Sequence, residues 1–192
     1  KSAQALITQF NYEELGMRVW LIKPSIDDRD GAAIVKSRVG LFREADVIFP
    51  EDDLRTRYEA AGKCDVIIAD EAQFLTPQQI DQLREIVDEA DIPVLCFGLR
   101  TDFLTHLFPG SQRLMELADS ITEIKNVCAC GSKATVNARL DANGNILTEG
   151  SQVFWEVTTA ILPCATDAGG KRFGRSAENR RKDLVVTIWP VF

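Results

Sequence analysis

The sequence lacks several features that would place it in a specialised class of protein. Its 192 residues include one histidine, and no apolar run approaches the length that crosses a bilayer. Basic residues are too few for a nucleic-acid-binding surface. The chain has 22 Lys and Arg residues and 29 Asp and Glu residues, which gives a formal net charge of -7. The sequence as given shows no signal-peptide pattern. We therefore expect a cytoplasmic protein that binds neither a membrane nor a nucleic acid strand.

Cysteine is present, but its placement argues against a secreted disulfide framework. Two of the five cysteines, Cys64 and Cys96, lie within stretches predicted as core strands. Repeats and low-complexity tracts are absent. An apolar content of 45% in 192 residues is sufficient for one ordinary domain with a small appendage.

Strand and helix patterns alternate along residues 1–121. Short apolar runs at 18–22, 64–69 and 93–97 predict buried strands, and 46–49 predicts another short strand. Helical patterns cover 3–15, 54–61 and 77–91, and a fourth helix is indicated by the apolar spacing over 114–121. Residues 37–40 indicate a loop or a short strand. This alternation predicts an α/β fold with a doubly wound or related parallel sheet.

The pattern changes after Thr122. Residues 122–127 and 133–140 predict strands, 128–131 a tight knuckle, and Asp141–Gly144 a hairpin turn. We expect a small β-rich appendage over 122–154. The tail, 155–192, shows no clear period before the apolar run 184–189, which is typical of an aggregation-prone strand.

The stretch CDVIIADEAQF, at 64–74, ends a buried strand in two adjacent carboxylates, Asp70 and Glu71. In open α/β sheets this end of a strand borders the ligand crevice, although a strand that simply exits into water would also carry acids. Lys1 and Ser2 open a helix, as the last two residues of a Walker A loop do, and as many ordinary helix starts do. The Asp70 strand has the form of a Walker B strand, whose aspartate helps to hold Mg²⁺. Glu71 would then accept a hydroxyl proton or only orient water.

Six stretches resemble one known family, in the order in which that family carries them. They are IDDRDG, SRVGL, ADEAQFLTPQQ, IPVLCFGLRTDF, LFPGSQ and TEIKNVCACGSKATVNARLD. The chain from Lys1 to about Val153 resembles the thymidine kinases shared by bacteria and the animal cytosol. The resemblance implies a RecA-like P-loop sheet with helices on both faces at 1–121, and a zinc-ribbon-like domain at 122–154. It also implies transfer of phosphate from ATP, with Mg²⁺, to the 5′-hydroxyl of thymidine, a homotetramer, and inhibition by thymidine triphosphate.

The resemblance implies roles for individual residues. Lys1 and Ser2 would end the phosphate loop, Asp70 would hold the metal, and Glu71 would be the general base. Phe74 would stack on the thymine, and the nucleoside pocket would be lined by Leu99, Phe103 and Phe108. Without the resemblance, these apolar side chains would be interpreted as ordinary core.

The remaining candidates are weaker. Arg29 would contact phosphate or nucleotide, and His106 has no implied role. Cys128 and Cys130 would be half of a structural Zn²⁺ site, which needs four ligands. The family takes its second pair from a later Y-x-x-x-C-x-x-[CH] segment, which this sequence lacks, and Cys164 has no partner at the right spacing.

Both ends depart from the family pattern. The glycines expected before Lys1 are missing, so we expect further sequence upstream, and very weak ATP binding and no kinase activity from the chain as written. Family likeness stops abruptly after Phe154. Inserting one base before the Trp155 codon permits a reading frame with the missing tyrosine and cysteine segment. A one-base deletion is therefore one hypothesis for 155–192, and a divergent tail is the other.

The sequence thus predicts an ATP-dependent thymidine kinase. One alternative is a P-loop ATPase or nucleotide-binding module in which Glu71 only orients water. Another is an inactive fragment. The dependence of ATP turnover on a nucleoside separates the kinase from the ATPase.

Overall fold

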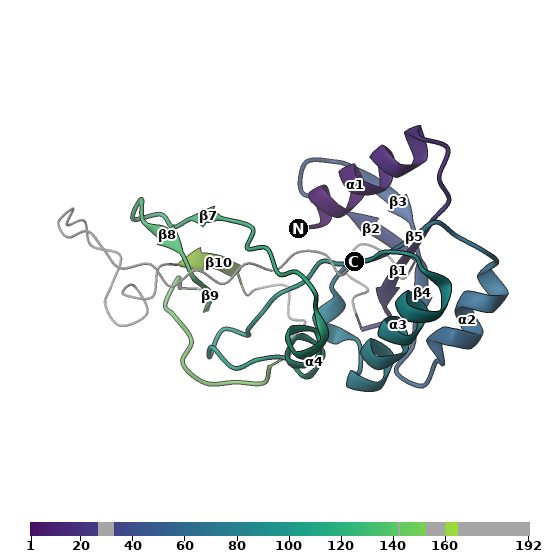
Figure 1. The fold of residues 1–192 in the computed structure, drawn as a ribbon. Helices are drawn as coiled ribbons and strands as arrows, with labels where there is room; N and C mark the ends of the chain where they lie inside the picture. Colours follow the sequence, from purple (N-terminus) through teal and green to yellow (C-terminus); the bar gives the residue numbers. More distant parts are fainter. Residues whose placement is uncertain (27–32, 142, 153–159, 165–192) are drawn as a thin grey trace. The chain divides into compact units, whose positions relative to one another are not determined.

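The computed structural model describes residues 1–26, 33–141, 143–152 and 160–164 (Figure 1). These residues form two compact units. The first unit comprises the described residues of Lys1–Arg100 and Phe108–Glu123. The second comprises Thr101–Leu107 and the described residues from Ile124 to Cys164.

A four-stranded parallel sheet forms the centre of the first unit. Its order is β4-β1-β5-β6, with β1 (Val19–Pro24), β4 (Asp46–Ile48), β5 (Val66–Ala69) and β6 (Val94–Cys96). Ala69, the last residue of β5, pairs with Ile22 on one side and with Cys96 on the other. The predicted α/β fold with a parallel sheet is confirmed, and β5 lies inside the sheet rather than at an edge.

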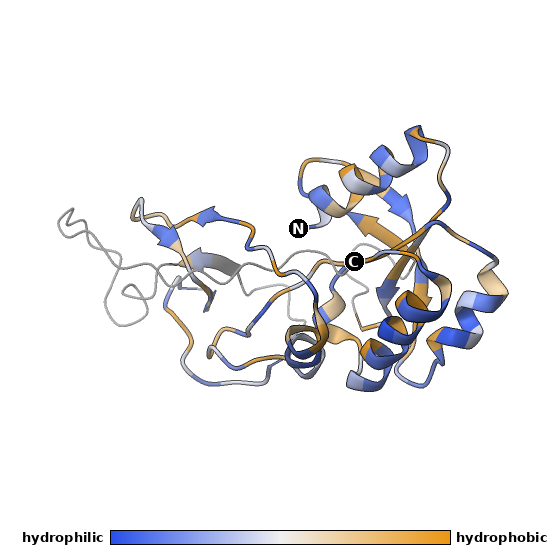
Figure 2. Cartoon of the chain, in the orientation of Figure 1, coloured by the Kyte–Doolittle hydropathy of each residue, from blue (hydrophilic) through white to orange (hydrophobic). Residues whose placement is uncertain are grey.

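Helices cover both faces of this sheet. Alternate residues of the central strands therefore pack into two different apolar clusters, one on each face. Val66 and Ile68 pack against α1 (Ser2–Glu14). Ile67 and Ala69 belong to a larger cluster that includes residues of α2 (Leu54–Ala61), α3 (Pro77–Ala90) and α4 (Pro109–Leu117). Figure 2 shows the same separation, with apolar strands inside and polar outer helix faces. All four residues of β5 are fully buried, as expected for a strand covered on both faces.

The start of α3 has the predicted geometry. Gln79 N–H donates to Thr76 Oγ1 at 3.2 Å, Thr76 N–H donates to Gln79 Oε1 at 3.0 Å, and Pro77 occupies the first turn. This reciprocal pair satisfies two backbone N–H groups at the helix terminus. The helix ends at Ala90, one residue before the expected end near Asp91.

Removing this cap should weaken the fold without touching the candidate site. We expect Thr76→Ala to lower the free energy of unfolding by about 1 kcal/mol, because an N-terminal N–H of α3 then loses its acceptor. Urea unfolding followed by circular dichroism measures the change. Thr148→Ala, at an exposed threonine, is the control and should change little. Equal stability of the two variants would contradict the role of the cap.

One further element is confirmed and two differ. Residues 37–40, expected as a loop or a short strand, form the turn of a hairpin between β2 (Ile34–Lys36) and β3 (Phe42–Glu44). The fourth helix begins at Pro109 and ends at Leu117, so the expectation of 114–121 was wrong at both ends. The apolar spacing marks only the buried side of the last helical turn, and Pro109 sets the true start. The strand expected at 122–127 forms only at Asn126–Val127.

The second unit is rich in short strands. β7 (Asn126–Val127) pairs with β8 (Lys133–Ala134), and β9 (Val136–Leu140) pairs with β10 (Ala160–Cys164), both antiparallel. The strand expected at 133–140 is therefore two strands, separated at Thr135. The predicted turn at 141–144 is confirmed by Gly144 N–H donating to the Asp141 carbonyl at 3.0 Å. Arg29, the junction after Phe154 and the run 184–189 lie outside the described residues.

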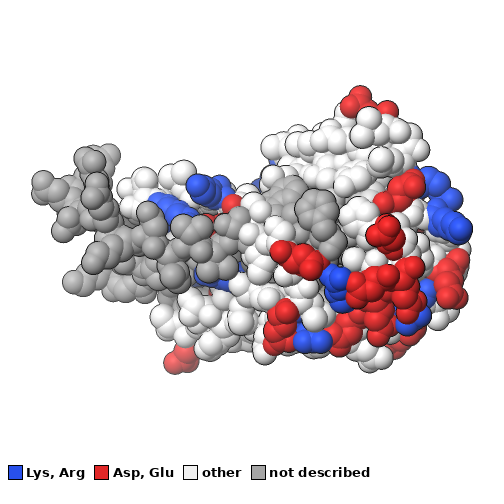
Figure 3. Space-filling view, viewed as in Figure 1, with Lys and Arg blue, Asp and Glu red and all other residues white. Residues whose placement is uncertain are grey.

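One surface of the first unit carries many acidic side chains, interleaved with arginines (Figure 3). Arg55 of α2 pairs with Glu85 and Glu89 of α3 at 2.9 and 2.6 Å, and Arg113 of α4 pairs with Asp81 at 2.6 Å. Exposed pairs of this kind contribute little stability each. Within the described ranges no helix is both long and apolar enough to cross a membrane.

Candidate active site

The first residues of α1 meet the end of β5. Lys1 Nζ lies 3.3 Å from Glu71 Oε2 and 3.4 Å from Glu71 Oε1. The Ser2 side chain lies close enough to the Asp70 carboxyl group for hydrogen bonding to lower its pKa. Four residues that the sequence singled out, separated by about 70 positions in the chain, are therefore neighbours. The helix start and the strand end are adjacent because α1 packs directly on β5.

Asp70 is a buried carboxylate with spare capacity for a ligand. The residue is 3% exposed, and its Oδ1 has no hydrogen-bond partner among the described residues. Burial raises the pKa of Asp70, and the neighbouring Glu71 carboxylate raises it further, whereas the Ser2 hydrogen bond opposes both effects. A buried oxygen without a partner, beside a hydroxyl, fits a hard divalent cation such as Mg²⁺, which prefers oxygen ligands.

Glu71 adopts a backbone conformation that is costly for a residue with a side chain. Its φ is 50° and its ψ is 36°, in the left-handed region, and it precedes the short 3₁₀ helix η1 (Ala72–Phe74). This conformation costs about 1–2 kcal/mol relative to right-handed backbone. Two backbone bonds hold the turn, from Ala72 N–H to Phe97 O at 2.9 Å and from Phe74 N–H to Glu71 O at 3.0 Å. Strain of this kind is concentrated at functional sites in proteins.

Gln73 is a site residue that sequence reasoning missed. Its Nε2 donates to Glu71 Oε2 at 2.5 Å, and its Oε1 accepts from Leu99 N–H at 2.9 Å. The residue is 2% exposed. In the sequence, Gln73 stood within ADEAQF without a periodic or charge signal of its own. Only the close approach of the turn after β5 to the segment after β6 reveals its contacts.

The predicted nucleoside-pocket residues fall in different units. In the first unit, the rings of Phe74 and Phe108 lie edge to face with centroids 5.4 Å apart, and Phe108 is buried. Leu99 is half-buried, and its carbonyl accepts from Ser111 Oγ at 2.6 Å. Phe103 belongs to the second unit, where the Arg139 guanidinium lies 4.0 Å from the centre of its ring.

The cysteine arrangement differs from the sequence-based expectation. Cys128 and Cys164 are both buried in one small apolar cluster. Burial raises the pKa of the Cys164 thiol, and Cys128 adds to the effect. Cys130 is exposed. In the part of the chain that the structure describes, no three histidine, cysteine or acidic side chains come together to hold a metal ion, so these residues do not fit a closed zinc site.

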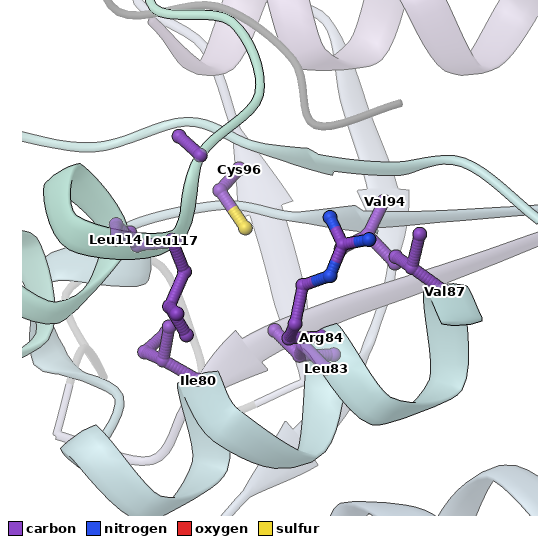
Figure 4. Close-up of a pocket in the computed structure, with 9 residues that line it drawn as sticks. Ile80, Leu83, Arg84, Val87, Val94, Cys96, Leu114 and Leu117 are labelled. Carbon is purple, nitrogen blue, oxygen red and sulfur yellow. The ribbon is translucent and has the colours of Figure 1, made fainter. Parts of the chain in front are cut away.

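An apolar pocket lies between α3, α4 and β6, and none of the predicted site residues lines it. Figure 4 shows the Cys96 thiol among Ile80 and Leu83 of α3 and the two leucines of α4. Burial raises the pKa of this thiol to about 12, so it is protonated and unreactive at neutral pH. The pocket therefore offers apolar contact area and no reactive group.

Comparison with known proteins identifies relatives of the chain. A model of the thymidine kinase family matches residues 1–158. The thymidine kinase of Ruegeria pomeroyi is 46% identical over 157 residues, which cover 80% of this chain and 79% of the relative. Two further relatives are the thymidine kinases of Vibrio cholerae, 46% identical, and of phage T4, 45% identical. Each alignment covers 80% of this chain and 81% of the relative.

Proposed function

The chain belongs to the thymidine kinase family, and we propose that it transfers the γ-phosphoryl group of ATP to the 5′-hydroxyl of thymidine. One observation supports this most directly. Lys1, Ser2, Asp70 and Glu71 meet at the carboxyl end of β5, where open α/β sheets bind their ligands. A cation, a hydroxyl and two carboxylates are the groups that phosphoryl transfer requires.

Lys1, Ser2 and Asp70 would bind the phosphate donor, ATP. Magnesium, arriving with ATP as substrate, neutralises charge on the phosphate oxygens. The Ser2 hydroxyl and the unpartnered Asp70 oxygen would hold this ion. The Lys1 ammonium, which contacts Glu71 in the free protein, would turn to the phosphates when ATP binds. That movement would release Glu71 from its cationic neighbour.

Glu71 would then act on the acceptor. Its carboxylate takes the proton of the 5′-hydroxyl while the hydroxyl oxygen forms a bond to the γ-phosphorus. The bond between that phosphorus and the bridging oxygen breaks, and ADP leaves with the bonding electron pair. Glu71 is only 7% exposed, which limits the water that could compete with the hydroxyl.

The nucleoside base would be recognised by aromatic and aliphatic side chains. We assign stacking on the thymine to Phe74, and the lining of the pocket to Leu99, Phe103 and Phe108. The edge-to-face contact of Phe108 supports Phe74 in a single orientation. The Arg139 guanidinium, which lies over the Phe103 ring, likewise supports that ring in one orientation.

The finer architecture forms part of this proposal. We assign a RecA-like P-loop domain to 1–121, a zinc-ribbon-like domain to 122–154 and a tail outside the family to 155–192, in a cytoplasmic enzyme. The first assignment is supported by helix α1, which has Lys1 as its N-cap and begins at Ser2, next to the inner strand β5, which Asp70 directly follows. The second is supported by the knuckle at 128–131, where Gly131 N–H donates to Cys128 O at 2.9 Å.

Self-association and feedback inhibition would accompany the activity. Large apolar side chains are exposed on α1 and on the neighbouring hairpin, including Ile7 at 50%, Phe10 at 47% and Phe42 at 62%. Exposed apolar groups of this size mark interaction surfaces, and we assign this one to a homotetramer. Thymidine triphosphate carries both the base and the phosphates that the site would bind, which suits it to inhibition.

Zinc should bind this chain weakly. Cys128, Cys130 and Cys164 supply at most three thiolates to a site that needs four ligands. We expect well below one zinc per chain by metal analysis after dialysis against a mild chelator. A chain with one base restored after the Phe154 codon is the comparison, and it should hold about one zinc and gain thermal stability. Stoichiometric zinc in the chain as written would contradict this prediction.

The experiment that tests the function compares ATP turnover with and without nucleoside. A full-length version, with a complete phosphate loop and the frame after Phe154 restored, should form thymidine monophosphate and ADP in equal amounts, and release little ADP without thymidine. Rapid ADP release that thymidine leaves unchanged would support an ATPase in which Glu71 only orients water. Deoxyadenosine serves as the control acceptor, because it presents the same 5′-hydroxyl on a different base.

A further inference from the structure

The contacts of Gln73 go beyond the groups that the proposed function uses. Its side-chain amide joins Glu71 to the backbone of Leu99 through two hydrogen bonds, of 2.5 and 2.9 Å. We propose that Gln73 is the positioning residue that holds the Glu71 carboxylate in its reactive orientation. This inference rests on the proposed function, in which Glu71 is the general base.

The backbone of Leu99 determines which way the amide points. The Leu99 N–H can only donate, so the Gln73 oxygen must face it and the Gln73 NH₂ group must face Glu71. The reverse orientation would set the amide oxygen against the carboxylate and the NH₂ group against another donor. Gln73 is therefore fixed as a donor to Glu71, and hydrogen bonds to a charged acceptor are the stronger kind.

Gly98 allows this arrangement. A Cβ at position 98 would lie 2.6 Å from Gln73 Oε1 and 3.1 Å from the Gln73 backbone nitrogen, closer than such atoms approach. The segment that includes Phe97 and Leu99 is joined to the turn at two points, by Phe97 O with Ala72 N–H and by Leu99 N–H with Gln73. A side chain at position 98 would displace the Gln73 amide while Gln73 and Glu71 themselves stay unchanged in sequence.

The hydrogen bond from Gln73 to Glu71 would remain when substrate binds. In the free protein both Lys1 and Gln73 donate to Glu71. The proposed function draws Lys1 toward the phosphates. A carboxylate at the end of a flexible side chain would then lose one of these two restraints at the moment of proton transfer. Gln73, which is buried and tied to the backbone, would preserve its position.

A second buried glutamine provides a matched control. Gln82 also accepts from a backbone N–H, that of Leu54 at 3.0 Å, and donates to a carboxylate, that of Asp53 at 2.8 Å. Its partners lie at the start of α2 and have no proposed role in the reaction. Replacing Gln82 therefore measures what the loss of the same two hydrogen bonds does to stability alone.

The test is a set of kinetic measurements on the full-length version, with a complete phosphate loop and the frame after Phe154 restored. Gln73→Met preserves side-chain length and removes both hydrogen bonds, and should lower kcat about 10- to 100-fold with little change in the KM of ATP or thymidine. In a Glu71→Gln background the same substitution should change kcat less than about twofold, because the group that Gln73 positions has gone. Gln82→Met should lower the melting temperature and leave kcat within about twofold.

Gly98→Ala gives an independent measurement if Gln73→Met does not fold. It should lower kcat about tenfold or more, and again only when Glu71 is present. Equal losses from Gln73→Met and Gln82→Met, or losses that multiply with Glu71→Gln, would overturn the positioning role. If Glu71→Gln itself has no effect on kcat, the proposed base is wrong. A loss in Glu71→Gln with none in Gln73→Met or Gly98→Ala would overturn this inference alone.

Discussion

In a full-length version with a complete phosphate loop and the frame after Phe154 restored, Glu71→Gln should lower kcat by about 10²- to 10⁴-fold, the usual contribution of a general base. The substitution preserves the length of the side chain and removes its ability to take a proton. The carboxamide oxygen can still accept from Gln73, which donates to Oε2 at 2.5 Å in the unmodified protein, so the turn after β5 should keep its shape. The KM of both substrates should therefore change by only a few fold.

Steady-state formation of thymidine monophosphate measures this loss. Glu85→Gln is the control, because Glu85 is an exposed glutamate of α3 whose recorded partner is Arg55. That variant should keep its activity, since exposed pairs contribute little. If Glu71→Gln turns over at nearly the unmodified rate, Glu71 is not the base, and a water-orienting role or another proton acceptor must replace it.

Asp70→Asn should reduce activity and stabilise the free protein at the same time. The amide has lost the negative charge that would hold Mg²⁺, so kcat/KM at low magnesium should fall about 10²- to 10³-fold, as expected when several kcal/mol of charge stabilisation are lost. High magnesium should restore part of the activity. The expected gain in stability follows from the raised pKa of the buried Asp70 carboxyl group.

The direction of the stability change depends on which state binds the proton more tightly. Burial raises the pKa of Asp70 in the folded protein above its value in the unfolded chain. The folded state therefore loses stability as pH rises from the ordinary aspartate pKa through the raised value, and above that range the loss is complete. Asparagine carries no such loss. The variant should be the more stable protein at neutral pH, and this advantage should shrink as pH falls from the raised pKa of Asp70 to the ordinary aspartate pKa, and be absent below it.

Two measurements test this prediction. Thermal unfolding at neutral and acidic pH gives the stability difference, and phosphorylation rates across a magnesium series give the functional loss. Asp88→Asn is the control, because Asp88 is exposed and Arg84 lowers its pKa, so that variant should be slightly less stable at neutral pH. Lower stability of Asp70→Asn at neutral pH would show that the charged Asp70 carboxylate is stabilised by contacts that outweigh its burial.

The stability lost at Asp70 and the strain at Glu71 are both located where the proposed chemistry occurs. One residue is a buried acid with an oxygen that lacks a described partner, and the other has left-handed backbone. Neither arrangement benefits the free protein. Both are consistent with a site that is arranged for a cation and a phosphate rather than for maximal stability.

Local patterns predicted the features that depend on neighbours along the chain. The apolar run at 66–69 indicated a buried strand, and Thr76 with Pro77 marked the start of α3. These predictions hold because burial on two faces and the capping of a helix have sequence signals of their own. The hairpin of β2 and β3 and the start of α4 were missed, because three-residue strands and a single proline give weak signals.

By itself the sequence determined the α/β class, the end of β5 in Asp70 and Glu71, and the kinship with thymidine kinases. Tertiary structure alone decided which groups meet. The ion pair of Lys1 with Glu71 joins residues 70 positions apart, and the contact of Gln73 with Leu99 joins residues 26 apart. Such contacts depend on how two βα turns approach each other across the sheet, and no local pattern of charge or apolarity encodes that approach.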